Sequence, residues 1–165
     1  MPRSPRFWLG VAGGWLLFGG FAHLGYHVWG LVLENDVAGG LREFAAQAMK
    51  QAQSPDPLRP SLWRAFRLYS ASLALLFLFA GIVDMAAALG DVPHRVRTGI
   101  ALIQTVFWTV AFVPFAFIDP VIQPLAVVGM AVPLHGIAYI TAEAAVQEDD
   151  AARVAETVTG PTPPA

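Results

Sequence analysis

The chain contains no cysteine, which excludes disulfides, thiolate nucleophiles and zinc–thiolate sites. Charged residues are also scarce. They make up 13% of the sequence, against about 25% in an ordinary soluble domain. The formal net charge of −2 offers no basic surface to a polyanion. We therefore expect neither a disulfide-stabilised domain nor a nucleic-acid-binding protein.

Long apolar runs make up most of the sequence. The hydrophobic fraction is 56%, and residues 7–33 include no Lys, Arg, Asp or Glu. A helix of about 20 apolar residues spans a bilayer core, and the first run is too long for the apolar core of a signal peptide. We predict an all-α integral membrane protein, an antiparallel four-helix bundle in one domain over residues 1–146, with the lipid bilayer as its surroundings. The helices are expected at about 7–33, 62–89, 96–118 and 121–146.

Two further segments lie outside these spans. Residues 37–53 place apolar side chains at i, i+3, i+4 and i+7 spacing, which predicts a short amphipathic helix at the membrane interface between the first two spans. Residues 147–165 are acidic and then rich in Thr and Pro, which predicts a disordered tail.

The distribution of basic residues gives little help with orientation. Equal numbers of Lys and Arg flank the two ends of the predicted bundle, so the positive-inside rule favours neither side. Arg3 and Arg6 emerge first during synthesis, and for that reason we place the termini in the cytoplasm, with the protein in a bacterial inner membrane.

Polar side chains within the apolar runs are the candidate functional residues, because such groups are costly in lipid. They are His23, His27, Asp84, Gln104 and His135. The helical rise places His23 and His135 in opposite halves of the membrane, which opposes joint ligation of a haem. Asp84, Gln104 and His135 share one half and are expected to form a polar cluster. No metal site is predicted, and hydrogen bonding across the bundle is the favoured interpretation of the histidines.

Glycines of the first run suggest a packing surface. Gly10, Gly13 and Gly14 lie close together, and Gly10 and Gly14 form a GxxxG pair. Small residues at this spacing let two helix backbones approach closely. The face serves either internal packing or contact with a partner subunit.

Three short motifs carry a resemblance to a known family. They are Gly20-Phe-Ala-His23-Leu-Gly25, Ala48-Met49-Lys50, and Trp63-x2-Phe66-x2-Tyr69 leading into an apolar helix. In these motifs the first half of the chain resembles an uncharacterised family of small bacterial four-helix membrane proteins, DoxX-like in layout. Ala22 departs from the pattern, where a glycine is expected. The family has no established reaction, so the resemblance implies the fold and draws attention to His23 and Trp63.

These observations lead to one leading function and one alternative. No nucleophile, base and orienting group can be assembled from the sequence, so we do not expect an enzyme. The leading prediction is a non-catalytic small membrane subunit that packs against other integral membrane proteins, in an energy-transducing complex. The alternative is a membrane binder of a small hydrophobic ligand or cofactor, such as a quinone, a lipid or haem, near His23, His27 and His135.

Overall fold

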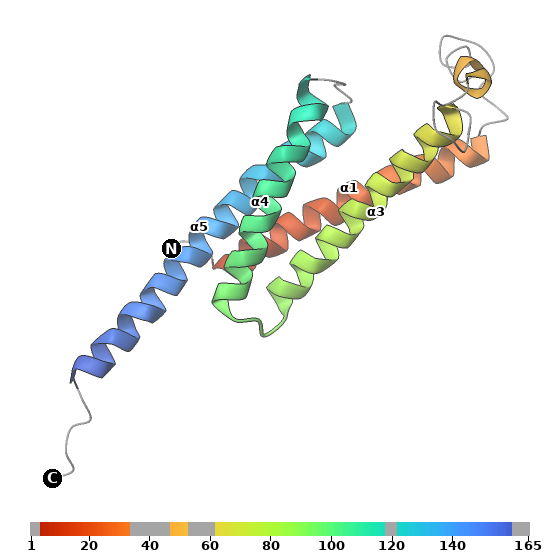
Figure 1. Ribbon diagram of the computed structural model, residues 1–165. Helices are drawn as coiled ribbons and strands as arrows, with labels where there is room; N and C mark the ends of the chain where they lie inside the picture. Colours follow the sequence, from red (N-terminus) through yellow and green to blue (C-terminus); the bar gives the residue numbers. More distant parts are fainter. Residues whose placement is uncertain (1–3, 34–46, 53–61, 118–121, 160–165) are drawn as a thin grey trace. The chain divides into compact units, whose positions relative to one another are not determined.

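The computed structural model describes residues 4–33, 47–52, 62–117 and 122–159. Four long helices account for most of these residues, and no strand occurs within the described ranges (Figure 1). They are α1 (Pro5–Leu33), α3 (Leu62–Leu89), α4 (His94–Phe117) and α5 (Ile122–Thr159). The all-α prediction is confirmed, and the predicted bounds of α3 agree with the structure.

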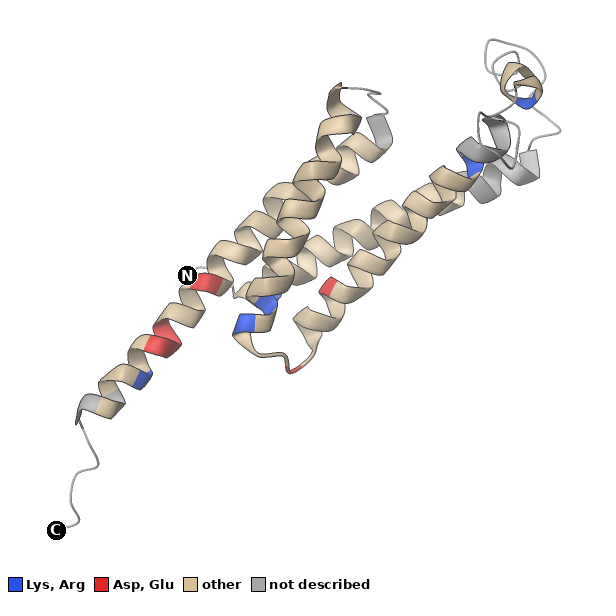
Figure 2. Ribbon diagram, viewed as in Figure 1, with Lys and Arg blue, Asp and Glu red and all other residues tan. Residues whose placement is uncertain are grey.

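Each of these four helices contains an apolar segment of membrane-spanning length. The segments are Pro5–Tyr26, Arg67–Leu89, His94–Pro114 and Pro124–Ala155. Charged residues of α4 and α5 gather toward one end of these helices and leave long uncharged stretches (Figure 2). By length and composition, therefore, four helices are suited to cross a membrane.

The C-terminal part of α5 corrects the prediction for the tail. The helix is 38 residues long and continues to Thr159, so the prediction of disorder is wrong for residues 147–159. This stretch contains no Gly or Pro and is rich in Ala, Glu and other good helix formers. The helix ends immediately before Gly160 and Pro161, which disfavour its continuation. Residues 160–165 lie outside the described part.

The predicted interfacial helix at 37–53 is described only in part. Residues 47–51 are helical, and residues 34–46 and 53–61 lie outside the described ranges.

The chain divides into two compact units, Met1–Leu16 with Ala80–Ala165, and Leu17–Phe79. In the first unit, α4 and α5 lie side by side (Figure 1), and the core is built largely from alanine, whose small side chain lets helices approach closely. The buried members are Leu9, Ala87, Ala88, Ala101 and Ala138, with Trp8, Ile100 and Tyr139 packed against them.

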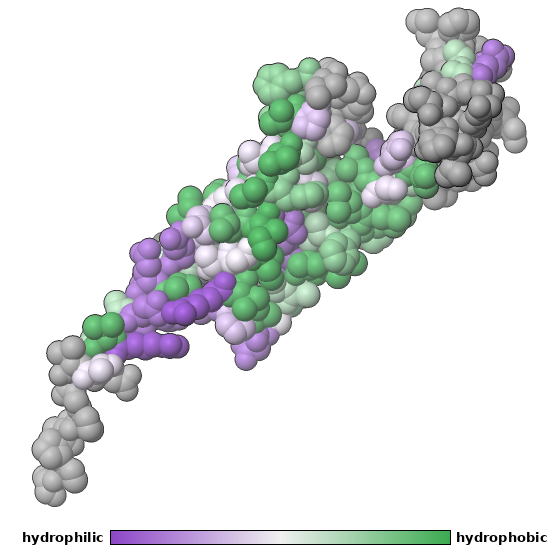
Figure 3. Space-filling model, in the orientation of Figure 1, coloured by the Kyte–Doolittle hydropathy of each residue, from purple (hydrophilic) through white to green (hydrophobic). Residues whose placement is uncertain are grey.

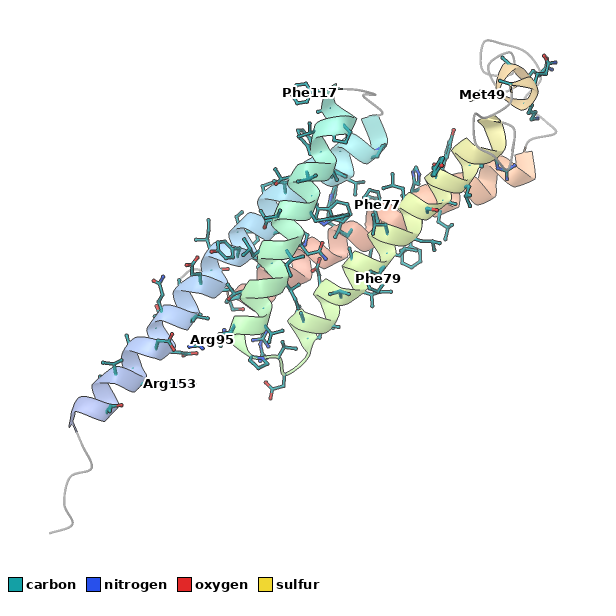
Figure 4. The ribbon with its side chains drawn as sticks, in the orientation of Figure 1. Met49, Phe77, Phe79, Arg95, Phe117 and Arg153 are labelled. Atoms are coloured by element: carbon teal, nitrogen blue, oxygen red, sulfur yellow. The ribbon has the colours of Figure 1, made fainter. Side chains whose placement is uncertain are left out.

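In the second unit, the remainder of α1 contacts the first part of α3. A Cβ added at Gly20 would lie 2.8 Å from the Leu78 side chain and 3.1 Å from the Ala74 carbonyl oxygen. Ala74 is fully buried, and Phe77, labelled in Figure 4, is nearly so. Close contact of α1 and α3 in this unit therefore depends on the missing side chain of Gly20.

Candidate functional site

A buried acid–histidine pair lies in the first unit. Asp84 is on α3 and His135 is on α5, and neither side chain is exposed. The His135 Nε2 and Asp84 Oδ2 atoms are 2.7 Å apart, and His135 Nδ1 donates to the Ala131 carbonyl oxygen, also at 2.7 Å. Both imidazole nitrogens of His135 are therefore engaged within the protein.

The hydrogen bonds determine how many protons the pair holds. A carbonyl oxygen only accepts, so Nδ1 carries a hydrogen. The contact between Nε2 and Oδ2 then needs one more proton, which lies either on the imidazole or on the carboxyl group. An imidazolium with a carboxylate and a neutral imidazole with a carboxylic acid have the same net charge of zero. The pair is neutral as a unit in both arrangements, which makes its burial tolerable.

Gln104, on α4, completes the predicted cluster. Its side chain interacts with the Asp84 carboxyl group. The Asp84 Oδ1 atom is buried and has no hydrogen bond of good geometry within the described part of the chain. The structure brings Asp84, Gln104 and His135 together from three helices.

The three predicted partner-packing glycines have different surroundings. A Cβ at Gly13 would lie 2.9 Å from both the Asp84 Cβ atom and the Gly81 carbonyl oxygen, so Gly13 serves contact between α1 and α3 inside the chain. At Gly10 a Cβ would meet the Ala88 Cβ atom at 3.7 Å, an ordinary contact. Gly14 is exposed and has nothing within 4 Å of the added Cβ. Of the three, Gly14 is the glycine with open space beside it.

The histidines of α1 fall in the second unit. His23 is buried, with 7% of its surface exposed, and its Nε2 atom is joined to the Ser70 hydroxyl by a hydrogen bond of 2.9 Å. His27 belongs to α1, but its side chain lies outside the described part. The structure thus supports a hydrogen-bonding role across two helices for His23.

Arg97 is a buried polar residue that the sequence analysis missed. It is 1% exposed. Its guanidinium donates from Nε to the Ala87 carbonyl oxygen and from an Nη atom to the Gly90 carbonyl oxygen, both at 3.0 Å. The last carbonyl groups of a helix lack helical partners, and Arg97 supplies donors where α3 ends. A basic residue shortly after the Gly90 helix stop was the available signal.

Trp15 makes a second contact that the sequence did not reveal. Its Nε1 atom donates to the Val127 carbonyl oxygen of α5 at 3.0 Å. Pro133 lies inside α5 and removes one backbone donor, yet α5 continues through it. The indole ties α1 to α5 at Val127, about two turns of helix before His135.

Within residues 4–33, 47–52, 62–117 and 122–159, no group of three or more His, Asp or Glu side chains is placed to hold a metal ion. Two pockets of the first unit, of about 450 and 220 Å³, are not lined by Asp84, Gln104 or His135.

Comparisons of the chain with protein-family models, curated proteins and solved structures find no match.

Proposed function

We propose that this chain is a non-catalytic integral membrane subunit, an antiparallel four-helix bundle that packs against partner membrane proteins. The observation that carries the proposal is that each of the four buried polar side chains in the described part of the chain makes a hydrogen bond within the protein. Asp84 bonds His135, His23 bonds Ser70, and Arg97 is held by backbone carbonyls. Side chains engaged in this way stabilise a bundle, and these four are not placed as a free nucleophile or base.

The proposed contact surface is the exposed face of α1 around Gly14. Val11 and Phe7 lie one and two turns before it and are exposed. A glycine flanked by larger apolar residues forms a recess that a partner helix can enter, because the two backbones can then approach closely. Gly13 faces α3 on the other side, so the same turn of α1 supports internal packing and partner contact.

We assign the outer face of α4 to lipid. In the most apolar part of the α4 span, 17% of the residues are buried within the protein. The corresponding share is 39% in each of the other three spans. The exposed face of α4 consists of large aliphatic and aromatic side chains. They are Leu102, Ile103, Val106, Phe107, Val110, Val113 and Phe117. Such side chains match the acyl region of a bilayer.

The same proposal has three further parts. It places the protein in a bacterial inner membrane with cytoplasmic termini, assigns it to the DoxX-like family, and gives it a role in an energy-transducing complex. These parts are supported by the apolar helices and by the sequence motifs around His23 and Trp63. The basic residues Arg3 and Arg6 support the orientation.

Binding of a small hydrophobic ligand is the second candidate function, and a shallow, open depression of about 450 Å³ is the place for it. This volume lies within the roughly 300–1,000 Å³ of typical ligand sites. The lining residues are Ser4, Arg6, Phe7, Gly10, Val11, Met85, Ala88 and Leu89. The pocket lies at the end of α1 and α3 and does not include the histidines, so a ligand held there would not be coordinated by imidazole.

The test is intact mass spectrometry of the protein purified in mild detergent from its native membrane, together with an absorption spectrum. We expect partner subunits in fixed ratio and no chromophore on this chain. Gly14→Leu should release the partners. Gly99→Leu is the matched control, because Gly99 of α4 also has nothing within 4 Å of an added Cβ. A lone protein carrying a stoichiometric ligand, or equal release by both variants, would contradict the proposal.

A further inference from the structure

A half-open pocket bordered by charged residues lies where the first turn of α4 meets the charged end of α5. Its volume is about 220 Å³, far above the roughly 10–15 Å³ that a cavity needs to admit one water. Arg95 of α4 and Arg153 of α5 border it and are labelled in Figure 4. The complete lining is Pro93, His94, Arg95, Val146, Asp149, Asp150 and Arg153.

The pocket presents charges of both signs, and some of these charged groups do not take part in an ion pair. The Arg95 guanidinium donates to both carboxylate oxygens of Asp150, at 3.0 and 3.2 Å. Asp149 and Arg153 lie one turn apart on α5, and within the described residues neither side chain forms an ion pair. The His94 Nδ1 atom is buried and has no hydrogen-bond partner in that same part of the chain. One carboxylate and one guanidinium therefore remain available to a ligand.

The position of the pocket along the helices points to a lipid headgroup. The candidate span of α4 begins at His94, and that of α5 ends at Ala155 and has the acidic run from Glu148 to Asp150 near its C-terminal end. Hydrophilic surface gathers over this end of α5 (Figure 3). In a bilayer, the hydrocarbon core of about 30 Å is flanked by polar layers that bring the total to about 40–45 Å. A pocket at the charged ends of these two spans would lie at the level of such a layer.

We propose that this pocket binds the headgroup of a zwitterionic phospholipid that carries a primary amine. Arg153 would hold the phosphate, and Asp149 would accept hydrogen bonds from the ammonium group. The lining has two arginines and two aspartates. A purely anionic headgroup would be repelled by the carboxylates, and a purely cationic ligand would be repelled by the guanidinium groups. A primary ammonium has three N–H donors, whereas a quaternary amine has none to offer Asp149.

The inference goes beyond a role as a membrane subunit and does not depend on the partner surface at Gly14. It requires only that the end of α4 and α5 lie at the lipid headgroups. A failure of partner binding and a failure of lipid binding are therefore separate results.

The test uses the delipidated full chain in detergent, titrated with short-chain phosphatidylethanolamine, phosphatidylcholine or phosphatidylglycerol and measured by native mass spectrometry. We expect preferential retention of phosphatidylethanolamine. Asp149→Asn and Arg153→Gln should each lower its retention by roughly tenfold, because each removes a charge-assisted hydrogen bond. Glu148→Gln is the matched control, since Glu148 is a neighbouring carboxylate outside the lining.

The remaining outcomes are distinguishable. Equal retention of the three lipids, stronger retention of phosphatidylglycerol, or an unchanged preference in both pocket variants would overturn the proposal. Soluble phosphoethanolamine serves as the competitor. Weak competition supports a lipid, whose chains add affinity, and competition as strong as that of the lipid would assign the pocket to a soluble phosphate ester instead. Circular dichroism of each variant confirms that the compared proteins have the same helix content.

Discussion

His135 on α5 and Asp84 on α3 are joined by a fully buried hydrogen bond of 2.7 Å, and a second bond from His135 to Ala131 leaves the imidazole no free nitrogen. The arrangement needs one proton between Nε2 and Oδ2 and has no net charge. Each residue is therefore tolerated in an apolar interior because of the other. Removing one member should cost more than removing both.

The first prediction concerns this pair. His135→Leu should destabilise the protein by roughly 3–5 kcal/mol, because it leaves a buried carboxyl group without its partner. The double variant Asp84→Leu with His135→Leu should recover much of that loss, since two apolar side chains need no partner. Thermal unfolding in detergent measures both. Equal destabilisation of the single and double variants would show that the two side chains do not act as a pair.

The second prediction compares two adjacent glycines of α1. Gly13→Ala should destabilise by roughly 1–3 kcal/mol, as overpacked cores do, because the new methyl group meets Asp84 and the Gly81 carbonyl at 2.9 Å. Gly14→Ala adds the same methyl group in open space and should stabilise the isolated chain by about 0.5–1 kcal/mol through helix propensity. Denaturant titration of the two variants measures the difference. Similar effects from both would contradict the packing described for Gly13.

The third prediction concerns the end of α3. Arg97→Leu removes the donors to the carbonyl oxygens of Ala87 and Gly90, and each buried carbonyl left unpaired costs about 1–3 kcal/mol. Faster amide hydrogen exchange around residues 86–93 is the expected readout. Arg95→Gln is the control, because its ion pair with Asp150 is exposed and such pairs contribute at most about 1 kcal/mol. Unchanged amide exchange in Arg97→Leu would show that the guanidinium does not stabilise the end of α3.

The fourth prediction separates a structural His23 from a ligand. His23→Gln keeps a side chain that can hydrogen-bond near Ser70. We therefore expect the absorption spectrum and the partner composition of the purified assembly to be unchanged. His23→Leu should lower the thermal midpoint and leave the spectrum as it was. Loss of a chromophore in His23→Gln would instead make the imidazole a cofactor ligand.

The sequence predicted the helices well where its signal was strong. The bounds of α3 follow from an apolar run of membrane length, and helical rise placed Asp84, Gln104 and His135 at a similar depth. The C-terminal end of α5 was missed, because an acidic composition was interpreted as disorder although residues 147–159 have good helix formers and lack helix breakers. Helix propensity was the better guide there.

The sequence by itself determined that this protein has four helices apolar and long enough to cross a membrane, because span length and lack of charge are local properties of the chain. Only the tertiary structure decided that Gly13 packs inside the chain while Gly14 remains open, and that Arg97 closes the end of α3. Adjacent residues of a helix point about 100° apart, so their environments depend on which neighbouring helix lies on each side. That choice is made by packing between segments distant in the sequence.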